Sequence, residues 1–229
     1  MAHDHAPSRA RPVSPDTDPA EHWEEFYSGD EHPWSGNPNR LLVQHAPALP
    51  HADARALDIG CGSGADAIWL AEQGWQTLGI DLAEAALGHA RSAAASSAAV
   101  ERLAWQRVDA SDELPAGSWD LITASYLHSP VRLERVAALQ RAAAAINPGG
   151  VLLIIAHQGM PHWVRRRWEE EVMDAVALPT TDELLAELDL DPAMWTVEVA
   201  EEDAVEMTDP DGNRAERIDN VLRLRRRRN

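Results

Sequence analysis

The chain has 229 residues, a formal net charge of −18 and one cysteine. This length suits one domain with a large core and excludes a small disulfide-stapled scaffold, and one cysteine excludes an intramolecular disulfide or a thiolate metal cluster. The negative charge argues against general binding to nucleic acid or anionic membranes and favours a small or cationic substrate. We expect a cytoplasmic protein, because a reducing compartment suits this cysteine usage.

Residues 1–17 mix polar, charged and proline residues without an apolar core, which predicts a disordered lead-in and neither a secretion signal nor a membrane span. Residues 18–50 predict an N-terminal helical lid. Its first helix is expected to begin at the capping-box pattern of residues 18–21 and to carry Trp23, Phe26 and Tyr27 on one face. Its second helix is expected to begin at Asn37-Pro38.

From residue 51 to residue 229, short apolar segments alternate with helical patterns, which predicts one domain. Strands are expected at 56–59, 76–80, 103–108, 119–124 and 151–156, and near 195–199 and 220–224. Helices are expected at 65–73 with Ser63 as N-cap, at 83–95, and from Ser129-Pro130 to a turn at 147–150. Repeated βα units predict a parallel sheet with helices on both faces.

Two further segments complete the expected domain. The apolar run 151–156 is about a third of the roughly 20 residues that cross a bilayer, so it predicts a buried strand and no membrane contact. Residues 157–193 predict a helical segment on the substrate side, because apolar residues recur every four positions from Val164 to Val176 and a second helix start lies at 180–183. The polar residues 209–212 predict a hairpin turn between the last two strands.

A glycine-rich turn follows the first predicted strand of this domain. Gly60, Gly62 and Gly64 let the backbone approach a ligand closely, and the following helix directs its N–H groups at it. The turn also satisfies the dinucleotide-binding pattern, with Asp81 about 20 residues on, where a ribose-binding acid belongs. On this motif alone, a nicotinamide or flavin enzyme remains an alternative.

Acidic residues at three strand ends resemble the class I, Rossmann-like family of S-adenosylmethionine-dependent methyltransferases, over residues 57–156. Asp58 lies just ahead of the glycines, Asp81 ends the second strand, Asp109 follows the third, and a Pro-Gly-Gly turn precedes the fifth. The resemblance implies a three-layer sandwich with a mostly parallel seven-stranded sheet and an antiparallel last strand. It implies S-adenosylmethionine as cofactor and S-adenosylhomocysteine as product.

The same resemblance implies the roles of the acids. Asp58 would help to hold the cationic methionyl end of the cofactor, and Asp81 would accept both ribose hydroxyls. Asp109 would face the adenine amino group, with a backbone N–H from Ala110. The full set of cofactor-binding residues that it implies is Asp58, Gly60, Cys61, Gly62, Asp81, Leu82, Asp109, Ala110, Ser125 and Trp34.

Residues 32–39 resemble the segment that closes over the cofactor in small-molecule methyltransferases, including the thiopurine and tellurite-resistance types. The resemblance implies that Trp34 touches the cofactor or the substrate, and it implies the same contact for Tyr27. The alternative is that Trp34 only packs the first helix against the sheet.

The candidate catalytic residues are His128, His157 and Tyr27. His128 and His157 follow the fourth and fifth predicted strands, at the carboxyl edge of the sheet where ligands bind in this kind of fold. An imidazole there could take a proton from an oxygen, nitrogen or sulfur nucleophile. Either histidine could instead be a solvent-facing residue at a strand end.

We therefore expect a methyltransferase acting on O, N or S of a small molecule, with an NAD(P)-dependent oxidoreductase and a non-catalytic cofactor-binding regulator as alternatives. Nucleic acid is disfavoured as a partner: each arginine of 165–167 has a glutamate four residues later, and residues 225–228 read as a short solvated tail. No spacing indicates a metal site. The oligomeric state does not follow from the sequence.

Overall fold

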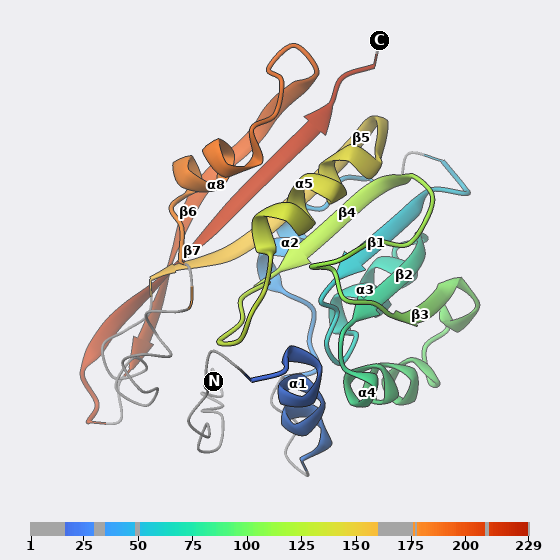
Figure 1. The fold of residues 1–229 in the computed structure, drawn as a ribbon, viewed down its shortest axis with the longest axis vertical. Helices are drawn as coiled ribbons and strands as arrows, with labels where there is room; N and C mark the ends of the chain where they lie inside the picture. The colour runs from blue at the N-terminus through green and yellow to red at the C-terminus, as the bar shows by residue number, and fades with distance from the viewer. Residues whose placement is uncertain are drawn as a thin grey trace.

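The computed structural model describes residues 17–29, 35–48, 51–159, 176, 178–208 and 211–228 (Figure 1). The expected contact residue Trp34, nearly all of the expected lead-in at 1–17, and residues 160–175 and 177 of the segment 157–193 lie outside these ranges. The first residues of that segment are described, and here the prediction is wrong: residues 157–159 continue a strand, because they pair with the last strand of the chain.

A seven-stranded sheet forms the middle of the molecule (Figure 1). Its strands are β1 (Arg55–Ile59), β2 (Gln76–Asp81), β3 (Leu103–Arg107), β4 (Trp119–Ser125), β5 (Ile146–Gly159), β6 (Trp195–Thr208) and β7 (Arg214–Arg226). Their order is β3-β2-β1-β4-β5-β7-β6. Strand β7 runs antiparallel to both of its neighbours and the other six run parallel to one another, which confirms the predicted fold class.

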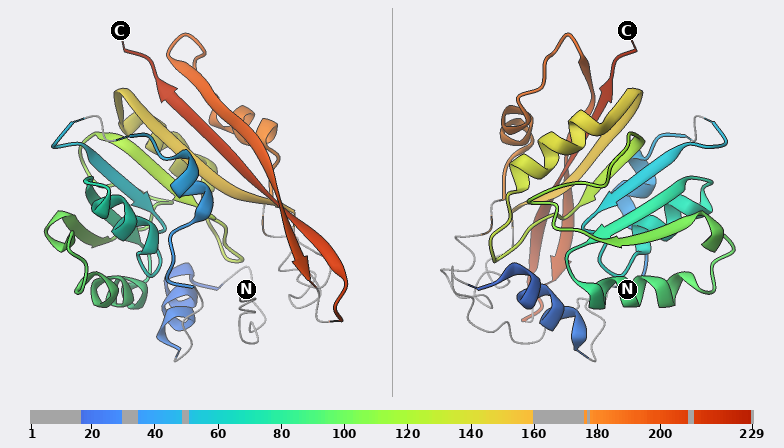
Figure 2. Two further views of the ribbon diagram at one scale, coloured as in Figure 1. Left: turned by 180° about the vertical axis from the view of Figure 1, so that it is seen from behind. Right: turned by 45° about the vertical axis from the view of Figure 1, so that its right-hand side comes forward.

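Helices cover both faces of the sheet, as Figure 2 shows from two sides. The described helices are α1 (Pro19–Ser28), α2 (Arg40–His45), α3 (Ala65–Glu72), α4 (Glu84–Ala94), the 3-10 turn η1 (Val100–Arg102), α5 (Arg135–Ala145) and α8 (Thr181–Leu188). Alternate residues of strand β5 pack against the helices on opposite faces of the sheet. Leu152, Ile154 and Ala156 pack in the core under α5 and α8, and the alternate residues, such as Leu153, pack in the core under α2 and α3. A strand buried on both faces is what the run 151–156 predicted.

Three helix starts differ from expectation. Helix α2 is capped by Asn39, whose side chain accepts the Leu41 N–H at 2.9 Å, so it begins after Asn37-Pro38. Helix α3 is capped by Gly64, with φ of +84° and no side-chain cap, because the glycine turn continues past Ser63. Helix α5 begins at Arg135, well after Ser129-Pro130, and the intervening residues form a loop.

Two strand regions also differ from expectation. The Pro-Gly-Gly residues 148–150 lie within β5, because the strand already pairs at Ile146 with Trp119 before a register irregularity. Strands β6 and β7 are much longer than predicted and pair from Trp195 and Arg226 to Thr208 and Arg214. Figure 2 shows this hairpin extending beyond the other strands. The helix start expected at residues 180–183 is confirmed at α8, where Thr180 and Glu183 form a capping box.

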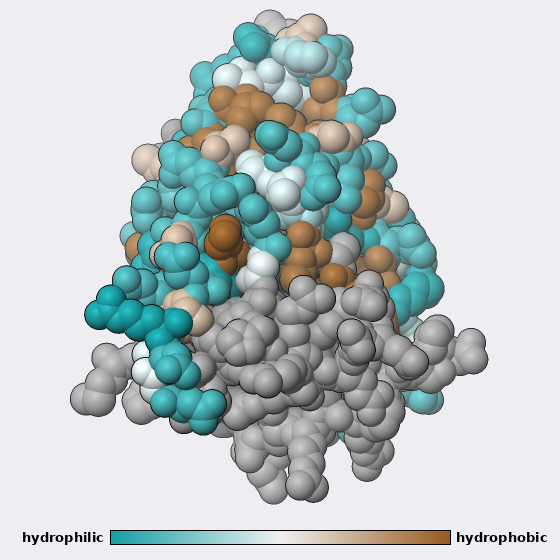
Figure 3. Space-filling model, turned by 90° about the vertical axis from the view of Figure 1, so that its left-hand side faces the viewer, coloured by the Kyte–Doolittle hydropathy of each residue, from teal (hydrophilic) through white to brown (hydrophobic). Residues whose placement is uncertain are grey.

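The described surface is mostly hydrophilic. On the face drawn in Figure 3, hydrophilic residues surround small hydrophobic areas. Among the described residues, only Val43, Val100 and Val197 are large hydrophobic side chains that are well exposed. Within the same ranges, no helix has the length and apolar character needed to cross a bilayer.

We predict that Gly79→Ala lowers the free energy of unfolding by about 1–3 kcal/mol, the usual cost of overpacking a core. A Cβ at Gly79 in β2 would lie 2.5 Å from the ring of Trp105 and 3.0 Å from Sγ of Cys61. Gly88→Ala is the matched control: it lies exposed within α4 with no atom within 4 Å of the added Cβ. This control is expected to stabilise by about 0.5–1 kcal/mol. Urea denaturation of both variants checks the pair, and equal shifts would contradict it.

Candidate cofactor and acceptor site

The glycine turn connects β1 to α3 at the carboxyl edge of the sheet. Gly60, Gly62 and Gly64 have φ values of +68°, +52° and +84°. These values lie in the left-handed region, which residues with a Cβ adopt only at a cost in free energy. The N–H of Cys61 donates to the carbonyl of Ile80 at 2.9 Å, which ties the turn to the end of β2. The turn therefore has one fixed shape.

Asp81 holds the turn from the end of β2. Its Oδ2 accepts the N–H of Gly62 at 2.9 Å, and its Oδ1 accepts the N–H of Ala83 at 3.0 Å. The side chain is buried, and burial raises its pKa, although these backbone donors act to lower it. Asp81 therefore orders the loop as well as presenting carboxylate oxygens at the edge where a ligand would lie.

Asp58 is a buried acid at the end of β1. It is 2% exposed, and its Oδ1 accepts the hydroxyl of Thr123 at 2.9 Å. Burial and the nearby carboxylates of Asp66 and Asp81 raise its pKa well above the ordinary value. A buried acid without a cationic partner is costly, so this position favours a ligand that brings positive charge.

Asp66, an acid in the first turn of α3, lies in the same region. Its Oδ1 accepts the backbone N–H of Asn39 at 2.6 Å. Burial raises its pKa, against the N–H of Asn39 and the nearby hydroxyl of Ser125. Two buried acids, Asp58 and Asp81, and the partly buried Asp66 thus lie around the glycine turn, where the sequence predicted two acids.

One buried polar atom in this region, Oδ2 of Asp58, has no hydrogen-bond partner among the described residues. Buried polar atoms are normally satisfied, so this atom indicates a polar ligand. The carboxylates are not arranged around a metal position, since no cluster of three or more His, Cys, Asp or Glu in the described ranges could hold an ion.

The other predicted cofactor residues lie around this centre. Asp109 follows β3, and its Oδ1 accepts the N–H of Ser111 at 2.8 Å while its Oδ2 lies 3.7 Å from Arg132. Ala110 and Leu82 offer their carbonyls to arginine side chains. These contacts leave the adenine and ribose roles of the three residues as predictions.

Tyr27 lies at the packing contact between α1 and α4. Its ring contacts those of Trp23 and Phe26, and it packs with Ala83 and Ala86. Its carbonyl oxygen lies 2.9 Å from Nε2 of His89. The predicted shared face of the three aromatic residues is confirmed, and the contacts of this buried residue give Tyr27 a structural role.

A second cluster joins the ends of β4, β5 and β7, and it includes both predicted histidines. His157 on β5 lies opposite Asp219 on β7 in the strand register, and its Nδ1 is 2.7 Å from Oδ1 of Asp219. The backbone N–H of His157 donates to Nε2 of His128 at 2.9 Å. The two imidazole rings are stacked, with centroids 5.5 Å apart.

Sequence reasoning missed three members of this cluster: Tyr126, Arg217 and Asp219. The Tyr126 hydroxyl donates to Oδ2 of Asp219 at 2.9 Å, and its ring stacks on His157 at 4.1 Å. Arg217 donates to both oxygens of Asp219, from Nε at 3.0 Å and from Nη2 at 2.9 Å. The sequence does carry one signal for this cluster: Asp219 is an acid within the mostly apolar segment 218–222.

The cluster fixes the protonation of its members. Burial acts to raise the pKa of Asp219, but the hydrogen bonds from His157 and Arg217 outweigh it and hold that pKa at about 2. Burial lowers the pKa of His157, although Asp219 opposes this. Burial and the charge of Asp219 raise the pKa of Tyr126 well above its usual value. At neutral pH the cluster therefore holds an ionised Asp219, a neutral His157 and a protonated Tyr126.

The two clusters are adjacent. A Cβ on Gly60 would lie 2.9 Å from Cδ1 of Leu127, so the loop after β4 touches the glycine turn. Tyr126 begins this loop with φ of +52°, a conformation that is costly for a tyrosine. The strained turn brings its phenol to Asp219 and sets His128 beside His157.

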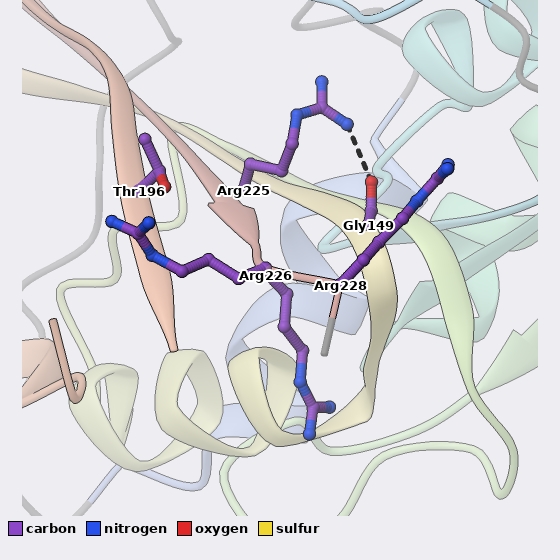
Figure 4. Close-up of a pocket in the computed structure, with 6 residues that line it drawn as sticks. Gly149, Thr196, Arg225, Arg226 and Arg228 are labelled. Carbon is purple, nitrogen blue, oxygen red and sulfur yellow. Dashed lines mark hydrogen bonds between the residues drawn. The ribbon is translucent and has the colours of Figure 1, made fainter. Parts of the chain in front are cut away.

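A separate pocket lies at the opposite, amino edge of β5 (Figure 4). Its lining is Gly149, Thr196, Arg225, Arg226, Arg227 and Arg228. Arg225 donates to the carbonyl of Gly149 at 2.7 Å and pairs with Glu198, and Arg226 donates to the carbonyl of Ile146 at 2.6 Å. The expectation of a merely solvated tail is thus wrong for Arg225 and Arg226, because these arginines donate to main-chain carbonyls where β5 begins.

The strand order with its single antiparallel strand and the acid-lined glycine turn define a Rossmann-like methyltransferase fold. A known family described as "Methyltransferase domain" matches residues 57–152. Residues 57–152 thus carry a methyltransferase domain of the class I type. This match favours a methyltransferase over the dinucleotide interpretation that the glycine turn alone left open.

Among curated relatives, glycine N-methyltransferase of Oryctolagus cuniculus is 29% identical over 128 residues, covering 49% of this chain and 43% of its own length. Thiopurine S-methyltransferase of Pseudomonas fluorescens is 50% identical over 50 residues, covering 21% of this chain and 22% of its own. Methyltransferases of ribosomal RNA and of a ribosomal protein also match. The chain spans less than half the length of the curated relatives it matches.

Among solved structures, the N-methyltransferase NodS of Bradyrhizobium japonicum in complex with S-adenosylhomocysteine has a TM-score of 0.62 at 18% identity, covering 91% of this chain and 99% of its own. This likeness supports the fold.

Proposed function

We propose that the protein transfers a methyl group from S-adenosylmethionine to an oxygen, nitrogen or sulfur atom of a small molecule. The observation that carries the proposal is the group of three acids around the glycine turn, two of them buried, with an Asp58 oxygen that has no partner among the described residues. A cofactor with a positively charged amino group and sulfonium offers the charge that this site lacks. A pyrophosphate would instead bring further negative charge next to Asp58.

The residues present fit this cofactor. Asp58 would hold its cationic end, and Asp81 would accept two hydroxyls through the lone pairs left beside its N–H contacts. Bound S-adenosylmethionine would supply a methyl group on a positively charged sulfur. Methyl transfer needs chiefly alignment of the reacting groups, so the rigid turn and the ordered loop after β4 act by positioning.

We assign the N-terminal residues 18–50 as a lid over this site. Support comes from contacts with both clusters: the N–H of Asn39 donates to Asp66, and Nε1 of Trp23 donates to Oγ of Ser129 at 3.2 Å, beside the loop that carries His128. Residues 51–229 form the methyltransferase domain in this proposal. The segment 157–193 and the lid would select the acceptor, since ligand-contacting residues concentrate on such flanking segments.

A small molecule is the acceptor class that the charge favours. The chain carries −18 formal charges, which opposes approach to a nucleic-acid backbone. The thiopurine and glycine methyltransferases among the relatives act, by their names, on small molecules. The reducing setting suggested by one cysteine goes with a cytoplasmic location.

Calorimetric titration tests the cofactor assignment. We expect the protein to bind S-adenosylhomocysteine and not NAD, and preference for NAD would overturn the proposal. Turnover of S-adenosylmethionine with a panel of thiols, phenols and amines then tests catalysis. Binding without any transfer would favour the alternative of a non-catalytic regulator.

A further inference from the structure

We propose that His157 is the general base of this reaction, positioned by Asp219, and that the acceptor is an ionisable thiol or phenol. The inference rests on the proposed function, because it assigns the acceptor half of the same site. Its basis is the hydrogen bonding of the cluster at the ends of β4, β5 and β7.

The position of the proton on His157 follows from its partner. An ionised carboxylate can only accept, so the 2.7 Å contact with Asp219 requires the proton on Nδ1 of His157. Nε2 of His157 then carries a lone pair, and it makes no hydrogen bond among the described residues. The side chain is 15% exposed, which leaves it accessible to a small acceptor.

His128 cannot fill the same role through its Nε2. That atom already accepts the backbone N–H of His157 at 2.9 Å, and a backbone N–H can only donate. His128 thus fixes the main chain at His157 and acts as a positioning residue. Of the two candidate histidines, the structure therefore favours His157 over His128 as the base.

The charge balance around Asp219 keeps His157 neutral. Asp219 is 1% exposed and receives four donors: Nδ1 of His157, Nε and Nη2 of Arg217, and the hydroxyl of Tyr126. Arg217 neutralises the carboxylate, so the imidazole gains orientation without being driven to the charged form. Protonated Tyr126 adds no charge to this arrangement.

The strength of this base selects the acceptor. A neutral imidazole with a pKa below its usual value can share the proton of a thiol, near 8.5, or a phenol, near 10. An aliphatic hydroxyl, with a pKa close to that of water at about 16, gives up its proton far less readily, so we assign the acceptor to the thiol and phenol classes. An uncharged amine already carries an attacking lone pair and needs no base beforehand.

In the proposed step, the S–H or O–H proton of the acceptor moves to Nε2 of His157. The electron pair left on the acceptor atom forms the bond to the methyl carbon. The methyl–sulfur bond breaks with its pair on the departing sulfur, which loses its positive charge. Because Arg217 offsets Asp219, the developing thiolate or phenolate meets no net negative charge beside the base.

Nitrogen-15 NMR of histidine-labelled protein tests the assignment without turnover. Comparison with His157→Gln identifies the His157 signals among the ten histidines. We expect Nδ1 protonated and Nε2 unprotonated at pH 7, with a pKa below 6.5. A proton on Nε2, or an imidazolium at pH 7, would overturn the proposal.

Kinetics give the second readout, with benzyl mercaptan, phenol and the matched amine aniline as probes. We expect transfer to the thiol or the phenol, with a rate that rises with pH below 6.5 and is level at pH 7. His157→Gln should lower the transfer rate at pH 7 by about 10²- to 10⁴-fold. In this variant the rate should increase with pH up to the pKa of the thiol or phenol, because only the ionised probe then reacts. His51→Gln, exposed and distant from the site, should change nothing.

Transfer only to aniline, or to none of the three probes, would overturn the acceptor assignment. Titration with S-adenosylhomocysteine separates this failure from failure of the proposed function. We expect His157→Gln to bind it as the wild type does. A wild-type protein that does not bind it at all would refute the cofactor assignment, whatever the protonation of His157.

Discussion

Replacing Asp58 by asparagine is expected to weaken binding of S-adenosylhomocysteine by about 10- to 100-fold while raising the melting temperature at pH 8. The loss of affinity corresponds to one hydrogen bond to a charged group, about 1.5–3 kcal/mol. Asparagine keeps the oxygen that accepts the Thr123 hydroxyl and removes the charge that burial disfavours. Function and stability should therefore move in opposite directions.

The pH dependence of stability follows from the direction of the Asp58 shift. The pKa of Asp58 is raised in the folded protein, so the folded state binds this proton more tightly than the unfolded state does. Its stabilising effect is full below the unfolded pKa, about 3.9, and is lost as pH rises through the folded pKa. The gain from Asp58→Asn should hence be largest at alkaline pH and vanish near pH 4.

Calorimetry and thermal melts check this prediction. A cationic ligand should release a proton from wild-type Asp58, so we expect affinity to increase with pH, and both effects should be absent in Asp58→Asn. Asp53→Asn is the matched control, because Asp53 is exposed just ahead of the same strand. A variant that binds as tightly as wild type would show that Asp58 does not hold the ligand.

Asp81→Asn is expected to weaken both binding and folding. The carboxylate accepts two backbone N–H groups, and an amide can accept only one, so its NH₂ group would face either Gly62 or Ala83. We expect a loss of affinity of about 10- to 100-fold and a net loss of stability of about 1 kcal/mol, since a buried donor is left unpaired.

Urea denaturation and titration of Asp81→Asn beside Asp58→Asn measure the contrast. One variant should be more stable than wild type at pH 8 and the other less stable, although both lose affinity. Stabilisation by Asp81→Asn would show that its N–H contacts do not hold the turn.

The cofactor half could be predicted from the sequence because its determinants are local. The strand end at Asp58, the three glycines and Asp81 lie within 24 consecutive positions, and their spacing carries the pattern. The position of Asp66 in this site could not be predicted from the sequence, because an acid there equally suits a helix N-terminus. Its contact with Asn39 places it in the site.

The acceptor half could not be predicted in the same way. His157 and Asp219 are 62 positions apart, and Tyr126 and Asp219 are 93 apart, so only strand pairing brings them together. The late start of α5 has a comparable cause: Oγ of Ser129 accepts the N–H of Val131 and the indole N–H of Trp23, which stabilises a loop where Ser-Pro predicted a helix.

The insertion of β7 between β5 and β6 has a consequence for biogenesis. Strand β6 is synthesised before β7 but reaches the sheet only through β7. Domains form from the N-terminus during synthesis, and long-range pairing is slow. A nascent chain can thus assemble its cofactor half from residues up to Ser125, whereas the base at His157 gains its carboxylate only after translation has passed residue 219.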